Sequence, residues 1–145
     1  MKLSENNKKT LLVSIHKLIE ENASYTVNDL EHKRTNQLIN YPSNGGLTEL
    51  EKSELEKMEL NSTLKSALRK VFASNTADVI FSFLNIIDGT SDPTVEFGEW
   101  KEVMLVDFND GNEMDSMLHD DFYETYWDWK EKRINPGWKL DLLDE

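Results

Sequence analysis

The chain has 145 residues, which is enough for one domain with a buried core, and its formal net charge is −12 at pH 7. It contains no cysteine, which excludes a disulfide framework and thiolate chemistry. Lys and Arg form only short groups, which argues against direct binding to nucleic acid or to an anionic membrane surface. The N-terminus is polar and the most apolar run, Val79–Ile87, is too short to span a membrane, so we expect a cytoplasmic protein.

The first sixty residues contain three helical patterns. Apolar residues at helical spacing predict a helix over Ser4–Asn22, which the polar residues 22–24 would end. A more polar helix is expected over Val27–Asn40, with Thr26 as its N-cap. The Pro and Gly residues of 41–46 predict a loop before the next helix.

The third helix is expected over Leu47–Leu60. Thr48 and Glu51 have the spacing of a capping box, in which each residue satisfies a free backbone amide of the other. This spacing supports a helix start in this region.

The strongest helical pattern is an apolar stripe from Leu64 to Ile87. Asn61 or Ser62 is suited to begin this helix and Asp88–Gly89 to end it, while residues 74–76 could divide it in two. Its last part, Val79–Ile87, is apolar on nearly all sides, so we expect it to lie at the centre of the fold.

The character of the chain changes after Gly89. Residues 100–108, from Trp100 to Phe108, are β-branched and aromatic enough to predict a strand. Its partner is left open between residues 94–97, a remote segment and a second copy of the chain, which would make a homodimer through Trp100–Phe108. An Asp-Gly turn follows at residues 109–112.

A helix rich in aromatic residues is expected over Leu118–Arg133. Leu118, Phe122, Tyr126 and Trp129 share one face of it. Tyr123 and Trp127 lie on a neighbouring face, and the remaining positions there are acidic: Asp120, Asp121, Glu124 and Asp128.

Together these patterns predict an α+β fold that is predominantly α-helical, with four or five helices and a small β element near residues 94–108. We expect a single domain over residues 1–145. Its helical part would span 1–88, and its acidic, aromatic-rich part 89–145.

The net charge of the chain is concentrated in residues 88–128. This stretch holds thirteen carboxylates and one base, Lys101, whereas acids and bases balance in the residues on either side of it. Like charges repel, so a folded protein keeps such a cluster where it is well solvated, metal-bound or destined for a positive partner. The carboxylates are Asp88, Asp92, Glu96, Glu99, Glu102, Asp107, Asp110, Glu113, Asp115, Asp120, Asp121, Glu124 and Asp128.

Metal binding and catalysis are weakly indicated. The loop around Gly111 has oxygen ligands but not the spacing of a calcium-binding loop, because Val106 and Met117 would fall at its first and last ligand positions. His119 has no partner histidine at helical spacing, and no nucleophile or phosphate-loop motif is present. We therefore expect no cofactor; the weak metal candidates, which would also serve a small metal-dependent hydrolase, are Asp107, Asn109, Glu113, Asp115 and His119.

The predicted helix over residues 118–133 also carries an aromatic surface within an acidic rim. Interfaces favour Trp and Tyr at their centre, and acid clusters accelerate encounter with basic proteins. We expect a non-enzymatic acidic protein-binding module with Tyr123 and Trp127 as anchors and Asp120, Asp121, Glu124 and Asp128 as its charge. By analogy of type alone, such a module would be a bacterial immunity or inhibitor protein that masks a basic partner, such as a toxin nuclease. A homo-oligomeric structural protein is a further alternative.

Overall fold

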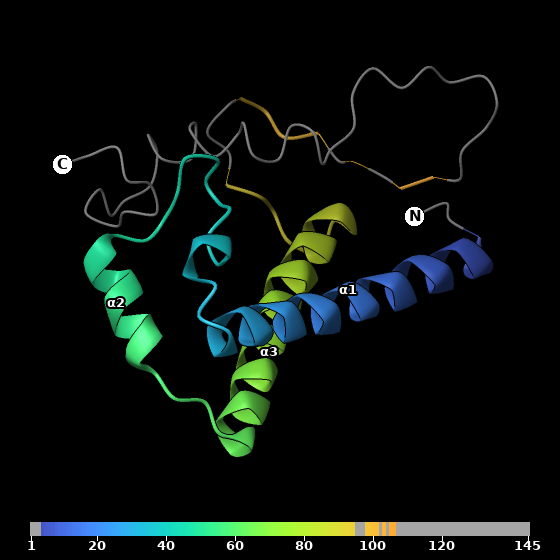
Figure 1. Ribbon diagram of the computed structural model, residues 1–145. Helices are drawn as coiled ribbons and strands as arrows, with labels where there is room; N and C mark the ends of the chain where they lie inside the picture. The colour runs from blue at the N-terminus through green and yellow to red at the C-terminus, as the bar shows by residue number, and fades with distance from the viewer. Residues whose placement is uncertain (1–3, 95–97, 102, 104, 107–145) are drawn as a thin grey trace. The chain divides into compact units, whose positions relative to one another are not determined.

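The computed structural model describes residues 4–94, 98–101, 103, 105 and 106. In these residues the chain forms three α-helices, α1 (Glu5–Glu31), α2 (Glu49–Lys57) and α3 (Ser62–Ile87), and one 3₁₀ helix, η1 (Thr35–Gln37) (Figure 1). The described residues divide into two compact units. One contains the chain up to Tyr25 and the chain from Asn61 onward, and the other contains Thr26–Leu60.

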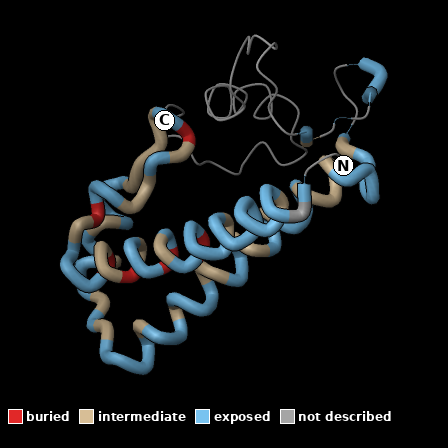
Figure 2. The backbone as a smooth tube through the Cα atoms, turned by 90° about the vertical axis from the view of Figure 1, so that its right-hand side faces the viewer, coloured by how far each residue is buried: buried red, intermediate tan, exposed pale blue. Residues whose placement is uncertain are grey.

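Helix α1 is one continuous helix where two had been expected. It runs through the polar residues 22–24 and ends at Glu31, so the predicted helices Ser4–Asn22 and Val27–Asn40 are both wrong in their bounds. The physical reason is a stripe of buried side chains that continues past the expected break (Figure 2). Side chains at this helical spacing lie on one face, so an unbroken helix buries all of them. The stripe is Ile19, Ala23, Val27 and Leu30, each at most 8% exposed.

The C-terminus of α1 is closed by a Schellman motif. The Arg34 amide donates to the Asp29 carbonyl at 2.9 Å and the Lys33 amide to the Leu30 carbonyl at 3.2 Å, with Lys33 in the left-handed region at φ 56°. Arg34 then pairs with the Asp29 carboxylate, Nη2 to Oδ1, at 2.6 Å. The motif ends the helix at Glu31, and only the 3₁₀ turn η1 follows where the second helix had been expected.

The expected loop is confirmed, and the helix after it forms over Glu49–Lys57, which is shorter than the predicted Leu47–Leu60. Residues 41–46 form a turn region in which the Tyr41–Pro42 peptide bond is cis. Helix α2 begins after Thr48 with the predicted capping box: the Glu51 amide donates to the Thr48 hydroxyl at 3.3 Å, and the Thr48 amide donates to the Glu51 carboxylate at 2.7 Å.

Helix α3 has the predicted ends and no break. The Asn61 side chain accepts a hydrogen bond from the Leu64 amide at 2.9 Å, which caps the start. At the other end Gly89 adopts φ 68° and donates to the Ile86 carbonyl, as expected for a helix that stops in the left-handed region. The polar residues 74–76 do not interrupt it, and the Thr76 hydroxyl donates to the Phe72 carbonyl of the preceding turn at 2.9 Å.

The expectation that Val79–Ile87 lies at the centre of the fold is wrong for the described chain. No residue of α3 is buried, and Figure 2 shows the helix in the colours of exposed and half-exposed residues. Val79 is 62% and Phe81 67% exposed. An apolar composition on all sides therefore did not produce a buried helix here.

Among the residues that the structure describes, the β element near residues 94–108 is not found. The described residues of that stretch form no strand, and Val106 is at most a single bridge position. This corrects the predicted α+β class, since the described chain is helical with three α-helices instead of four or five helices and a β element. Strand-like residues do not form a strand unless a neighbouring backbone satisfies their amides and carbonyls along its length. None of the described helices is long and apolar enough to cross a membrane.

Candidate functional site

The residues predicted for partner binding lie outside the described residues. This holds for Asp120, Asp121, Tyr123, Glu124, Trp127 and Asp128. It also holds for the weak metal candidates Asp107, Asn109, Glu113, Asp115 and His119, and for the predicted helix Leu118–Arg133. The structure therefore describes carboxylates of the acidic segment only at its start, between residues 88 and 106.

Carboxylates in the described start of the acidic segment face solvent. Asp88, Asp92 and Glu99 are all exposed, as is Lys101. None of these three carboxylates forms an ion pair with a base that the structure describes. Because each is exposed and has no counter-ion among those bases, this part of the segment presents net negative charge outward.

Ion pairs of the helical part are local. Acids and bases within residues 17–57 pair with one another over three to five positions. The shortest separations are 2.6 Å, in the pairs Arg34–Asp29 and Lys57–Glu54. These bases are therefore engaged by neighbouring acids and do not neutralise the described carboxylates of the acidic segment.

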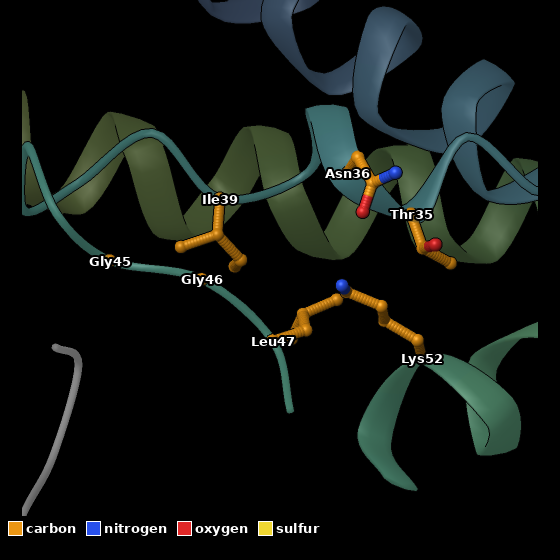
Figure 3. A pocket seen from close by; sticks show the side chains of 7 residues that line it. All are labelled: Thr35, Asn36, Ile39, Gly45, Gly46, Leu47 and Lys52. Atoms are coloured by element: carbon orange, nitrogen blue, oxygen red, sulfur yellow. The ribbon is translucent and has the colours of Figure 1, made fainter. Parts of the chain in front are cut away.

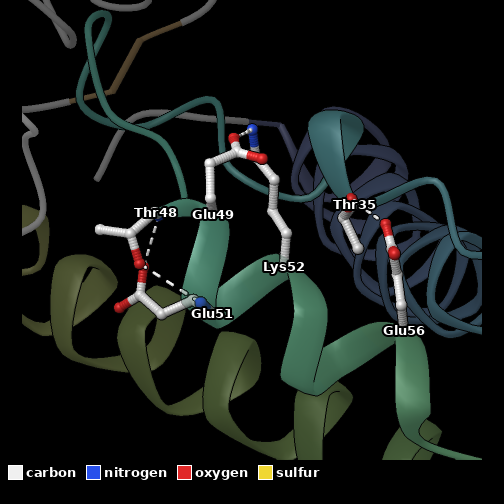
Figure 4. Close-up of polar contacts among 6 residues, drawn as sticks. All are labelled: Thr35, Thr48, Glu49, Glu51, Lys52 and Glu56. Carbon is white, nitrogen blue, oxygen red and sulfur yellow. Dashed lines mark hydrogen bonds and ion pairs between the residues drawn. The ribbon is translucent and has the colours of Figure 1, made fainter.

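A hollow of about 200 Å³ opens where the turn after η1 meets α2 (Figure 3). The Lys52 side chain extends along it, but its ammonium is held at 2.7 Å by Glu49 (Figure 4). On the η1 side, the Thr35 hydroxyl donates to the Glu56 carboxylate at 3.3 Å. These polar groups are satisfied by their neighbours, so the hollow has no side chain poised for chemistry. Its lining comprises Thr35, Asn36, Ile39, Gly45, Gly46, Leu47 and Lys52.

One ionisable group in this region is perturbed, and the cause is structural. The backbone amide of Thr48, and then its hydroxyl, hydrogen-bond the Glu51 carboxylate and lower its pKa below the ordinary value of 4.5. The carboxylate is fully exposed and caps its own helix (Figure 4). It therefore serves α2 and shows no sign of a catalytic role.

Asn44 is an unexplained polar residue beside this turn. Both polar atoms of its side chain, Nδ2 and Oδ1, are buried and make no hydrogen bond within the described chain. It does not line the hollow.

Metal binding has no support in the described residues. They contain no group of three or more His, Asp or Glu side chains placed to hold an ion. A divalent cation requires several such ligands converging on one point. Among the described residues, therefore, no such convergent group of ligands is found.

One feature that sequence reasoning missed is the exposed aromatic ring of Phe81. It lies off the apolar stripe of α3, and its side chain is 67% exposed. The available signal was its position: Asp78 is three residues before it and Asp88 seven residues after it, which places all three on one face. An aromatic ring between acids is the arrangement that had been expected around Tyr123 and Trp127.

Comparison with known proteins adds no family, so a function has to be inferred from the features described above. No protein-family model, no curated protein and no solved structure matches this chain.

Proposed function

We propose that this chain is a non-enzymatic acidic protein-binding module that masks a positively charged surface of a partner protein. The observation that carries the proposal is the concentration of the whole net charge in residues 88–128, where thirteen carboxylates accompany one base. Such a field raises the rate of encounter with a basic partner and opposes encounter with an acidic one.

The described residues support this proposal in two ways. Asp88, Asp92 and Glu99 are exposed, as an electrostatic surface requires. Lys17, Arg34, Lys52 and Lys57 pair with acids close to them in the chain, and none of them pairs with a described carboxylate of the acidic segment. An acidic segment neutralised by the helical part would have argued for a structural role instead.

The partner class follows from the charge and from the aromatic residues beside it. A nuclease has a cationic surface for phosphates, and a protein that carries carboxylates at the right places competes with nucleic acid for that surface. An immunity or inhibitor protein for a basic toxin nuclease is the specific form that we propose. Tyr123 and Trp127 would anchor it, and the carboxylates of residues 120–128 would supply the charge. The absence of cysteine suits a reducing compartment, so we propose that it acts in the cytoplasm.

Inhibition of cleavage by a panel of basic nuclease domains tests this function. The chain is added at equimolar amounts, and cleavage of labelled DNA and RNA is followed with and without it. We expect at least one nuclease to be inhibited and the inhibition to weaken in the triple variant Asp120→Asn, Glu124→Gln, Asp128→Asn.

The control for net charge is a triple variant that removes the same charge elsewhere. Glu20, Glu54 and Glu59 are exposed acids of the helical part, and their replacement by Gln should leave inhibition nearly unchanged. Equal loss in both triple variants would mean that total charge acts without a defined site. No inhibition of any basic nuclease would contradict the toxin-nuclease form of the proposal.

A further inference from the structure

Helix α3 presents an aromatic side chain to solvent in an acidic setting. Phe81 is 67% exposed, more than Phe83 at 47% or Trp100 at 38%. Asp78 and Asp88 share its helical face and are exposed as well. Neither carboxylate forms an ion pair with a described base, and the chain has no Lys or Arg between Lys70 and Lys101.

Tyr25 of α1 provides an internal comparison. It is 64% exposed and also has acids one turn away on each side, Glu21 and Asp29. There, however, each acid is paired with a base: Glu21 with Lys17 at 3.7 Å and Asp29 with Arg34 at 2.6 Å. The two rings are similarly exposed, but of their neighbouring acids only those beside Phe81 form no ion pair with a described base.

We propose that Phe81, with Asp78 and Asp88, is a docking surface for a protein segment that presents apolar side chains bordered by Lys or Arg. The proposal rests on the proposed function for the positive charge of the partner. It adds Phe81 of α3 as an anchor within the described residues. Charge complementarity selects this occupant, because unpaired carboxylates around an apolar ring favour cations at the rim and apolar groups at the centre. Burial of the ring would supply affinity, and the acids would supply rate and selectivity.

A pair of peptides tests the assignment with the full chain. The first is a synthetic amphipathic peptide of Leu and Lys with Leu on one helical face. The second carries the same lysines with every Leu replaced by Ser. Fluorescence anisotropy gives the Kd of each labelled peptide for the wild type, Phe81→Ala and Tyr25→Ala. Far-UV circular dichroism of each variant reports whether its helices are kept, which is expected because both side chains are exposed.

The expected result is that Phe81→Ala raises the Kd of the Leu/Lys peptide about tenfold or more, the size of a hot-spot truncation. Tyr25→Ala should change it by less than about twofold, and the Ser/Lys peptide should bind weakly to all three proteins. In a further variant, Asp78→Asn with Asp88→Asn, we expect slower association at low salt and little difference at high salt.

Other outcomes overturn the proposal in distinguishable ways. Wild-type binding that Phe81→Ala leaves intact would remove this surface and leave the proposed function standing. Equal losses for Phe81→Ala and Tyr25→Ala, or equal binding of the two peptides, would also remove it. A wild type that binds neither peptide would count against the proposed function itself. Light scattering that shows a dimer dissolved by Phe81→Ala would assign the ring to a second copy of the chain.

Discussion

The continuity of α1 can be tested with a proline at Ser24. This residue is exposed and lies in the helix interior, seven positions before Glu31. Proline there removes the amide that donates to the carbonyl four residues earlier and clashes with that carbonyl, which costs about 3 kcal/mol or more. The cost grows if the end of the helix is displaced, because Val27 and Leu30 are 0% and 8% exposed. Ser24→Ala is the matched control and should stabilise the helix by no more than about 0.5 kcal/mol.

Urea unfolding followed by circular dichroism and by tryptophan fluorescence measures this difference. A loss of about 3 kcal/mol corresponds to a drop in Tm of roughly 6–12 °C for a chain of this size. If Ser24→Pro unfolds within about 1 kcal/mol of Ser24→Ala, the chain tolerates a break there, and the continuous helix is wrong. The sequence signals at residues 22–24 would then have been the better guide.

Three further predictions concern burial and helix capping. Val27→Ala deletes two methyl groups from a fully buried side chain and should cost about 2–3 kcal/mol in urea unfolding, whereas less than about 1 kcal/mol would contradict its burial. Thr48→Ala or Asn61→Ala removes an N-cap and should each cost about 1 kcal/mol, and Ser at either position should restore most of it. The pKa of Glu51 is lowered in the fold, so the contribution of its carboxylate to the free energy of unfolding is complete above pH 4.5 and is lost as the pH falls through the lowered pKa. Glu51→Gln should flatten this pH dependence when stability is measured in an acid titration. An unchanged profile would contradict the assignment.

Local signals in the sequence predicted helix ends well. The capping box at Thr48, the cap at Asn61 and the stop at Gly89 all involve side chains or glycine dihedrals that act within a few residues, so tertiary context has little power to override them. The turn at residues 41–46 belongs to the same class. For α3 the sequence left Asn61 and Ser62 open as the cap, and the structure uses Asn61.

The predictions of where α1 ends and of which helix is buried were wrong, because both depend on contacts between distant residues. Asn22 and Ser24 suggested an end to α1, but the helix continues to Glu31 and buries Val27 and Leu30 beyond that point. Conversely, Val79–Ile87 is apolar enough for a core, yet the described chain leaves Val79 and Phe81 exposed. Burial depends on what packs against a helix, and neither periodicity nor composition contains that information.

The candidate site was only partly predictable for a similar reason. The position of the negative charge followed from counting residues, and its exposure at Asp88, Asp92 and Glu99 agrees with the expectation that charges seek water. Phe81 was overlooked because its apolar character suggested a core residue. Its acidic neighbours on the same helical face were the signal that could have identified it.

The salt dependence of association tests the central claim most directly. The rate constant for binding of the wild-type chain to a basic nuclease domain that it inhibits is measured by stopped flow from low to physiological ionic strength. If the acidic segment steers the encounter, the rate constant should approach about 10⁸ M⁻¹ s⁻¹ at low salt and fall steeply as salt is added. The triple variant at Asp120, Glu124 and Asp128 should show a shallower slope. A rate constant that stays near about 10⁵–10⁶ M⁻¹ s⁻¹ at every salt concentration, with the same slope in wild type and variant, would contradict a functional role for this charge.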